Sequence, residues 1–248
     1  DISADSAEET PLPGQPPAGG SISINCARFI NGIHGRVHAD GVAPDSSAGS
    51  ITISSSAVTN WGKITSDARG ELSGETQPLA GTIEISVSNY NLINTGTISA
   101  SCAYGKGGKG GTIGLYVEGS ISNSGLIVTG TFGDFNGTFG APMAGNIVLM
   151  TSYSFENTGI IDASSWLGDN GKGGTIDVIS TANITNQGHL SADTYGLETG
   201  SDHPEGGDIY ISTEETLYLD GSVSVESKTW QDPDGDGTVV LDYGQMGD

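Results

Sequence analysis

A five-residue phrase, Gly-Thr-Ile-x-Ile, recurs along the chain and constrains its fold more than any other feature. The phrase is clearest at 81–85, 111–115 and 174–178, and variants of it occupy five further places. The glycines that open the eight copies are Gly20, Gly49, Gly81, Gly111, Gly145, Gly174, Gly207 and Gly237. Successive copies are therefore 29 to 34 residues apart. A period in this range is typical of stacked repeat units.

Each copy of the phrase alternates apolar and polar residues, which predicts a strand with one buried face. A second pattern follows it: a bulky residue, a spacer, Asn, a spacer, Gly, a spacer and an apolar residue. Five units show this pattern, and their asparagines are Asn60, Asn94, Asn123, Asn157 and Asn186. Ile33 stands at the expected Asn position of the first unit and Leu219 at that of the last. Atypical terminal units are usual in repeat arrays.

Each repeat thus contains three short strands separated by turns, and no strand is long enough to build a core alone. Stacking the repeats in register would bury Ile on Ile and Asn on Asn, which predicts an all-β, single-stranded parallel β-solenoid of about seven coils with ~31-residue repeats. The stacked Asn side chains are expected to hydrogen-bond from coil to coil. The Gly that follows each Asn is expected to adopt a φ that other residues resist. We expect both residue types to be structural rather than catalytic.

Two segments divide the chain. Residues 1–19 contain Pro11, Pro13, Pro16 and Pro17, which predicts an extended tail that runs through solvent or along a neighbouring subunit. Residues 20–248 form the solenoid domain. The chain begins with Asp1 rather than Met, so the sequence fits either a mature secreted protein or an artificially started chain.

The net charge of −22, with only eight Lys and Arg, argues against nucleic acid and anionic membranes as partners. The sequence contains no run of eighteen apolar residues, so it does not predict a membrane-spanning helix. Cys26 and Cys102 fall in the first and third coils, about 10 Å apart by coil rise, which is too far for a disulfide. We therefore expect two buried free thiols, with a bridge between chains left open.

Most of the length variation falls in the connection after the third strand of each repeat, so the inserted residues share one edge of the solenoid. This edge collects Tyr104, Phe132, Phe135, Phe139, Trp166, Tyr195 and Trp230. Such a strip could bind sugar rings or a partner chain. Alternatively, each aromatic residue packs its own loop onto the solenoid.

One stretch resembles a metal site. Asp232, Asp234 and Asp236 alternate in a Gly-containing turn, with Asp242 further on, and hard cations such as calcium take oxygen ligands from turns of this kind. Tyr243 stands where a calcium loop would place its bidentate Glu, so an exposed acidic turn is the alternative. The histidines, His34, His38, His189 and His203, show no metal-ligand spacing. No Gly-x-Ser-x-Gly elbow is present and neither cysteine has an evident base partner, so we expect no enzymatic activity.

From Gly20 to Leu241 the repeats, Gly-Gly-Thr-Ile-x-Ile followed by Ile-x-Asn-x-Gly-x-Ile-x-Ala, resemble the right-handed parallel β-helices of filamentous haemagglutinin-type bacterial adhesins. The resemblance implies a right-handed coil and a surface or extracellular location, but fold alone does not determine activity. Pectate-lyase-like enzymes share only the coiling. Their calcium-plus-arginine site is hard to rebuild from the only arginines, Arg28, Arg36 and Arg69.

The sequence therefore predicts a secreted structural or adhesive protein that assembles end to end into a filament or surface fibre. Open strand edges at 21–24 and 238–242, together with the preceding tail, are the expected contacts between copies. The alternative is a polysaccharide-binding or polysaccharide-degrading protein that uses the aromatic edge. An ice-binding face of outward Thr is a third hypothesis, although Ser21, Asn146 and Asp208 interrupt that column.

Overall fold

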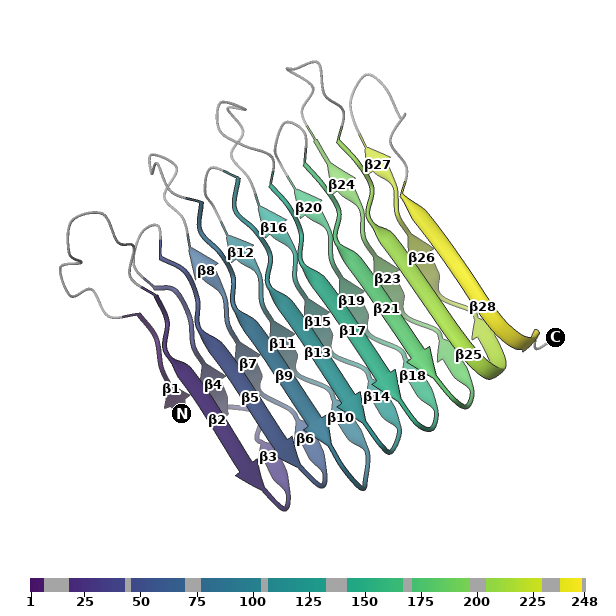
Figure 1. Ribbon diagram of the computed structural model, residues 1–248, viewed down its shortest axis with the longest axis horizontal. Helices are drawn as coiled ribbons and strands as arrows, with labels where there is room; N and C mark the ends of the chain where they lie inside the picture. The colour runs from purple at the N-terminus through teal and green to yellow at the C-terminus, as the bar shows by residue number, and fades with distance from the viewer. Residues whose placement is uncertain are drawn as a thin grey trace.

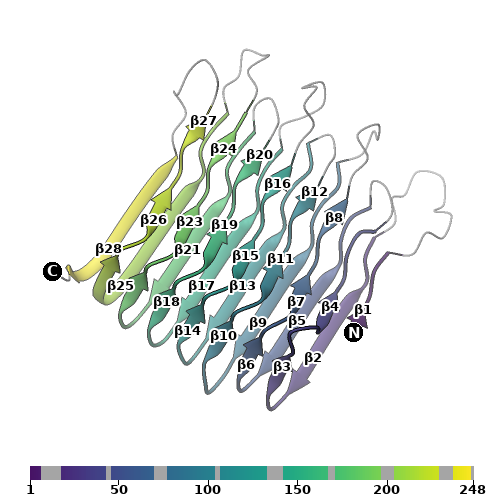
Figure 2. The ribbon, with the colours of Figure 1, turned by 180° about the vertical axis from the view of Figure 1, so that it is seen from behind.

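The computed structural model describes residues 1–6, 18–42, 46–69, 77–103, 107–132, 142–166, 171–196, 204–228 and 237–246. Over these residues the chain is an all-β parallel solenoid of about six turns, with a spacing of about 30 residues and no helix. This confirms the predicted fold class and is close to the predicted seven coils. Figures 1 and 2 show one stack of rungs with the two termini at opposite ends of it.

Equivalent strands of successive rungs lie side by side in four series. The first series, which contains the Gly-Thr-Ile phrase, consists of β2 (Ser21–Cys26), β5 (Ser50–Ser55), β9 (Thr82–Val87), β13 (Thr112–Val117), β17 (Asn146–Thr151), β21 (Thr175–Ser180), β25 (Asp208–Leu219) and β28 (Thr238–Met246). The second series, which contains the Asn pattern, consists of β3 (Phe29–Asn31), β6 (Val58–Asn60), β10 (Leu92–Asn94), β14 (Ile121–Asn123), β18 (Phe155–Asn157) and β22 (Ile184–Asn186). The long strand β25 pairs with both β21 and β22 and so joins these two series into one sheet.

The remaining two series complete each rung. The third series consists of β1 (Ile2–Ser3), β4 (Arg36–His38), β7 (Lys63–Thr65), β11 (Thr97–Ser99), β15 (Leu126–Val128), β19 (Ile160–Asp162), β23 (His189–Ser191) and β26 (Ser222–Ser224). The fourth consists of β8 (Ala68–Arg69), β12 (Cys102–Ala103), β16 (Thr131–Phe132), β20 (Ser165–Trp166), β24 (Thr194–Tyr195) and β27 (Ser227–Lys228). All the pairings between these strands are parallel and link equivalent residues of adjacent rungs.

The core consists of columns of aliphatic side chains that run along the axis of the solenoid. Ile83 lies between Ile51 and Ile113 in the paired strands, and all three are fully buried. Burying one such side chain contributes about 1.5–3 kcal/mol, and each rung buries several. Because a rung buries its apolar face only against its neighbours, the repeat pattern fixes the stack.

The predicted Asn ladder is present. Asn94, Asn123 and Asn157 lie in register, and the side-chain Nδ2 of each donates to Oδ1 of the next Asn at 2.7–2.8 Å. The ladder also includes Asn31, Asn60 and Asn186.

The prediction that Ile33 occupies the Asn position of the first rung was wrong. Asn31 pairs with Asn60, and Ile33 is 75% exposed in a two-residue insertion before Gly35. The first rung thus keeps its Asn, and only the spacing to the following Gly differs. In the last rung Leu219 does occupy the Asn position, paired with Asn186, as the sequence predicted.

The glycine after each ladder Asn is required for a different reason from the one expected. A Cβ added at Gly125 would lie 2.1 Å from the carbonyl oxygen of Gly96 in the adjacent rung, and the same holds for Gly159 against Gly125. These glycines do not adopt the left-handed conformation, which among the described glycines is found at Gly107. The close approach of successive turns, rather than a positive φ, excludes a side chain.

The first residues of the chain lie against the solenoid. Strand β1 pairs with β4, so that Ile2 faces Val37 and Ser3 faces His38. The proline-rich stretch of the predicted tail lies outside the described residues. No helix in the described part of the chain is long and apolar enough to cross a membrane.

Candidate functional site at the two ends of the solenoid

The C-terminal end of the stack leaves core positions uncovered. Val239 and Leu241 of β28 continue the buried columns of Ile209 and Ile211, which are 1% and 0% exposed. Val239 and Leu241 themselves are each 38% exposed. Their apolar faces are therefore placed for burial by a further rung.

The backbone edge at this end is also open. Within the described residues, β28 pairs with β25 alone, β26 with β23 alone and β27 with β24 alone. An unpaired strand edge presents N–H and C=O groups that can pair with another strand. In the described chain, the last rung therefore combines exposed apolar side chains with strands that pair on one side.

The N-terminal end has a different outline. Strands β2 and β3 pair on one side only, with β5 and β6, in the described part of the chain. Over the third series, in contrast, β1 covers β4 and leaves Ile2 45% exposed at the outer surface. The end of the stack is thus stepped: the third series extends one strand beyond the first.

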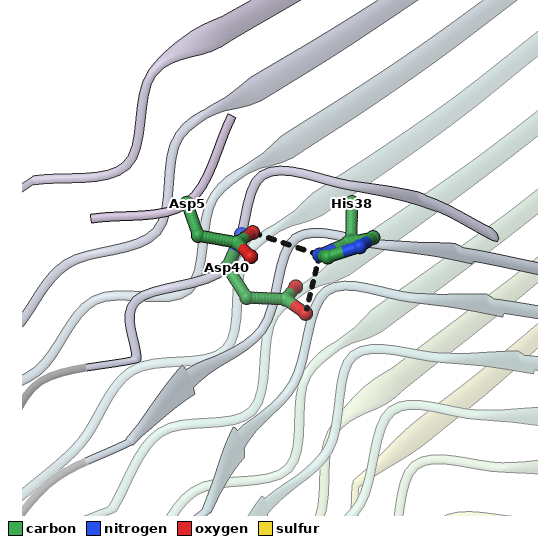
Figure 3. Close-up of side chains that lie close together, drawn as sticks. All are labelled: Asp5, His38 and Asp40. Atoms are coloured by element: carbon green, nitrogen blue, oxygen red, sulfur yellow. Dashed lines mark hydrogen bonds and ion pairs between the residues drawn. The ribbon is translucent and has the colours of Figure 1, made fainter. Parts of the chain in front are cut away.

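A cluster of ionisable side chains connects residues 1–6 to the first rung (Figure 3). Nδ1 of His38 lies 2.9 Å from Oδ1 of Asp5 and 3.9 Å from Oδ2 of Asp40, and its Nε2 lies 2.9 Å from Oδ1 of Asp1. Carboxylates only accept, so both close contacts are hydrogen bonds when the imidazole is protonated and donates from both nitrogens. His38 then links two acids of the N-terminal segment to β4.

Asp5 also continues a backbone pattern of the rungs that follow. Oδ1 of Asp5 accepts the N–H of Asp40, Oδ1 of Asp40 accepts the N–H of Asp67, and the same oxygen of Asp67 accepts the N–H of Ser101. Residues 1–6 therefore reproduce the geometry of residues 36–41, one rung earlier in the stack.

Asp5, His38 and Asp40 place three potential metal ligands within 4.8 Å of one another. Their oxygens nevertheless have protein donors: Oδ2 of Asp40 accepts from the Thr65 hydroxyl, and the Oδ1 atoms accept backbone N–H groups. The geometry fits a hydrogen-bonded contact between residues 1–6 and the first rung better than a metal centre.

Sequence reasoning found no metal-ligand spacing around His38 and missed this cluster. Asp5 lies 33 residues before His38, close to one repeat, and was placed in a tail rather than in a rung. A recurring aspartate is the sequence signal that could have indicated this cluster, since Asp5, Asp40 and Asp67 follow one another at intervals close to one repeat.

The predicted calcium ligands lie only partly in the described chain. Asp232, Asp234 and Asp236 fall outside the described residues. Asp242 lies exposed on β28, and one of its carboxylate oxygens is 3.5 Å from the Tyr210 hydroxyl. The structure therefore places one of the four residues, at the open C-terminal end.

Three of the predicted edge aromatics form a column across successive rungs. Trp166 stacks on Tyr195 with ring centroids 3.8 Å apart and an interplanar angle of 13°, and Phe132 lies 6.3 Å from Trp166 on the other side. The Tyr195 hydroxyl donates to Asp193 at 3.2 Å. The other four aromatics lie outside the described residues. Trp166 thus has an aromatic ring on either side, whereas Phe132 remains 45% exposed.

Both thiols are free, as predicted, although only one is fully buried. Cys102 is buried, and desolvation together with the nearby Asp67 raises the pKa of its thiol to about 12. Cys26 is half-buried beside Ser55. A thiol with so high a pKa is a poor nucleophile, because the thiolate is the reactive form.

The chain matches no family model, no curated protein and no solved structure. The parallel β-solenoid is therefore established by the structure, and the similarity to filamentous adhesins rests on the repeat pattern alone.

Proposed function

We propose that this chain is a secreted structural or adhesive protein of the extracellular space or cell surface. Its solenoid is a stiff unit that joins end to end with further copies into a filament or surface fibre, as the resemblance to filamentous adhesins implies. The partner in this proposal is the same chain, and neither nucleic acid nor membrane insertion plays a part.

The observation that carries the proposal is the uncovered last rung. Val239 and Leu241 expose 38% of their surface at positions that are buried in the preceding rungs. Full burial of a Val or Leu contributes about 1.5–3 kcal/mol, so covering the exposed remainder would contribute about 0.5–1 kcal/mol for each side chain. Pairing of the β28 backbone edge would add to this, which favours an added strand over free solvent.

The strong acidity of the chain shapes the expected conditions. A net charge of −22 makes copies repel one another, so assembly is expected to increase with salt or with divalent cations. Calcium held by the acidic turn with Asp232, Asp234 and Asp236 would act in the same direction. Calorimetric titration of the protein with calcium tests that part, and a flat trace would remove calcium from the proposal.

Electron microscopy and sedimentation across a range of protein concentrations test the assembly. The matched variants are Leu241→Lys, which puts a charge on the uncovered core face, and Val240→Lys, which puts the same charge on the outward face of β28. We expect elongated particles from the wild type and from Val240→Lys, and monomers from Leu241→Lys with unchanged circular dichroism. Strictly monomeric wild-type protein at high concentration and high salt would refute end-to-end assembly.

The alternative is a polysaccharide-binding or polysaccharide-degrading protein that uses the aromatic edge. Sugar rings stack on open aromatic faces, and in the column of Phe132, Trp166 and Tyr195 the faces are turned toward one another. This observation supports the structural proposal over the alternative. A screen of acidic and neutral polysaccharides for binding and for new reducing ends distinguishes the two.

A further inference from the structure

We infer that the two ends of this chain are complementary halves of one rung, so that each junction between copies is a composite rung built from two chains. The inference rests on the proposed end-to-end assembly and specifies its interface. One copy supplies β28, and the next copy supplies residues 1–6. Together these segments contain the first-series and third-series strands that every internal rung has.

The C-terminal end supplies the first-series strand of the proposed composite rung. Strand β28 continues the first series past β25, and beside it the third series stops at β26. Val223 of β26, which continues the buried column of Leu190, remains half-buried. A third-series strand is therefore what this end lacks in the described chain.

The N-terminal end supplies the third-series strand of the proposed composite rung. Strand β1 extends the third series beyond β4, and the backbone N–H groups of Ala4 and Ser6 donate to the carbonyls of His38 and Asp40. The carbonyl of Ala4 accepts the N–H of Gly20, just as the carbonyl of Ala39 accepts that of Gly49. Residues 1–6 thus form the closing part of a rung whose first-series strand is absent from the described chain.

The register within the chain specifies which strands of the two halves would pair. If β28 of one copy lies level with β1 of the next, β28 pairs with β2 and β1 pairs with β26, all in the parallel sense already present. The established register then places Val239 on Ile22, Leu241 on Ile24 and Ile2 on Val223. Each is a core position, and the strands meet at the usual spacing of about 4.8 Å.

Charge disfavours a pairing of two C-terminal ends. Glu214, Glu215 and Asp242 are exposed at the C-terminal end, whereas the N-terminal end carries Arg28 and Arg36 as well as the exposed Asp1. Two C-terminal ends facing each other would bring the three acids against their own copies, and like charges at an interface are unfavourable. A heterologous contact of this kind repeats without closing and produces a filament.

Disulfide trapping tests the composite rung, in a background with Cys26→Ser and Cys102→Ser. The first pair, Thr238→Cys with Ser21→Cys, joins exposed neighbours across the proposed β28–β2 contact. The second pair, Ser3→Cys with Ser224→Cys, joins the proposed β1–β26 contact. Paired residues of adjacent strands have Cα separations within disulfide range, whereas within one chain these residues lie at opposite ends of the stack. The off-register pair Thr238→Cys with Asn25→Cys is the control.

We expect both in-register pairs to give cross-linked multimers on a non-reducing gel while the control pair stays monomeric. Multimers from the first pair alone would overturn the composite rung and leave head-to-tail assembly intact. Failure of both pairs would overturn the inference, and microscopy of the same samples shows whether filaments still form by another contact. A dimer from Thr238→Cys alone would identify tail-to-tail pairing and refute the inference.

Discussion

The Asn ladder makes the most direct test of how this solenoid is held together, through the substitution Asn123→Ala. Asn123 is buried, receives a hydrogen bond from Asn94 at 2.8 Å and donates one to Asn157 at 2.8 Å. Replacing it by Ala leaves one buried donor and one buried acceptor without their partner. Each such loss costs about 1–3 kcal/mol, for a total of about 2–6 kcal/mol.

Secondary contacts reduce this cost. Nδ2 of Asn94 also lies 3.5 Å from the carbonyl of Leu126, and Oδ1 of Asn157 also accepts the N–H of Gly159 at 3.2 Å. Both orphaned groups thus retain a poorer partner, and we expect the free energy of unfolding to fall by about 2–4 kcal/mol. At the end of the ladder, Asn31→Ala removes one ladder hydrogen bond, to Asn60, and a longer one to the carbonyl of Lys63, and about half of that loss is expected.

Urea unfolding followed by far-ultraviolet circular dichroism measures these differences. The protein concentration must be one at which the wild type sediments as a monomer, because assembly would add apparent stability. Comparable m-values are also needed, since repeat proteins can unfold in parts. Asn89→Ala, at an exposed position, is the matched control and should change the free energy by less than about 0.5 kcal/mol. Equal losses at Asn123 and Asn31, or an Asn123 loss no larger than the control, would refute the ladder argument.

Three further predictions follow from individual residues. Gly125→Ala should destabilise the protein by about 1–3 kcal/mol in the same urea assay because its Cβ would overlap a carbonyl, whereas Gly32→Ala, with nothing within 4 Å, should be neutral; equal effects would contradict the close-approach argument. With a thiol pKa of about 12, Cys102 should react with a thiol reagent at pH 8 only after unfolding, while Cys26 reacts in the folded protein; rapid labelling of both would show the burial to be wrong. Burial raises the pKa of Asp67 above its ordinary 3.8, so its ionisation opposes folding above that pH; Asp67→Asn, which can still accept both hydrogen bonds, should raise Tm at pH 7 and lose this advantage as the pH falls through the raised pKa to 3.8, and a lower Tm at pH 7 would contradict it.

The stacking of the rungs could be predicted from the sequence because it depends on local patterns. Alternation of Ile83 and Ile85 with polar residues specifies a strand, and its return every 29 to 34 residues specifies the next rung. Asn94, Asn123 and Asn157 then align automatically, since each occupies the same place in its repeat. Even Leu219, the residue that ends the ladder, was placed correctly from spacing alone.

The candidate site depended on the tertiary structure at each point. Asp5 and His38 are 33 residues apart, and the uneven recurrence of Asp5, Asp40 and Asp67 does not by itself place residues 1–6 in a rung. Ile33 was misplaced because an insertion has no signature until strand pairing shows which Asn faces Asn60. The role of Gly125 likewise depends on how closely two turns approach, which is a distance between rungs and not a property of one.

The amino-acid sequence by itself thus determined the strands, their period and the inward columns, because these follow from which side chains avoid water. The tertiary structure alone decided where the columns end uncovered, at Val239 and Leu241, and which faces the aromatic column hides. Those features depend on what lies above and below a residue in space, and in a stack that neighbour is a whole rung away in sequence.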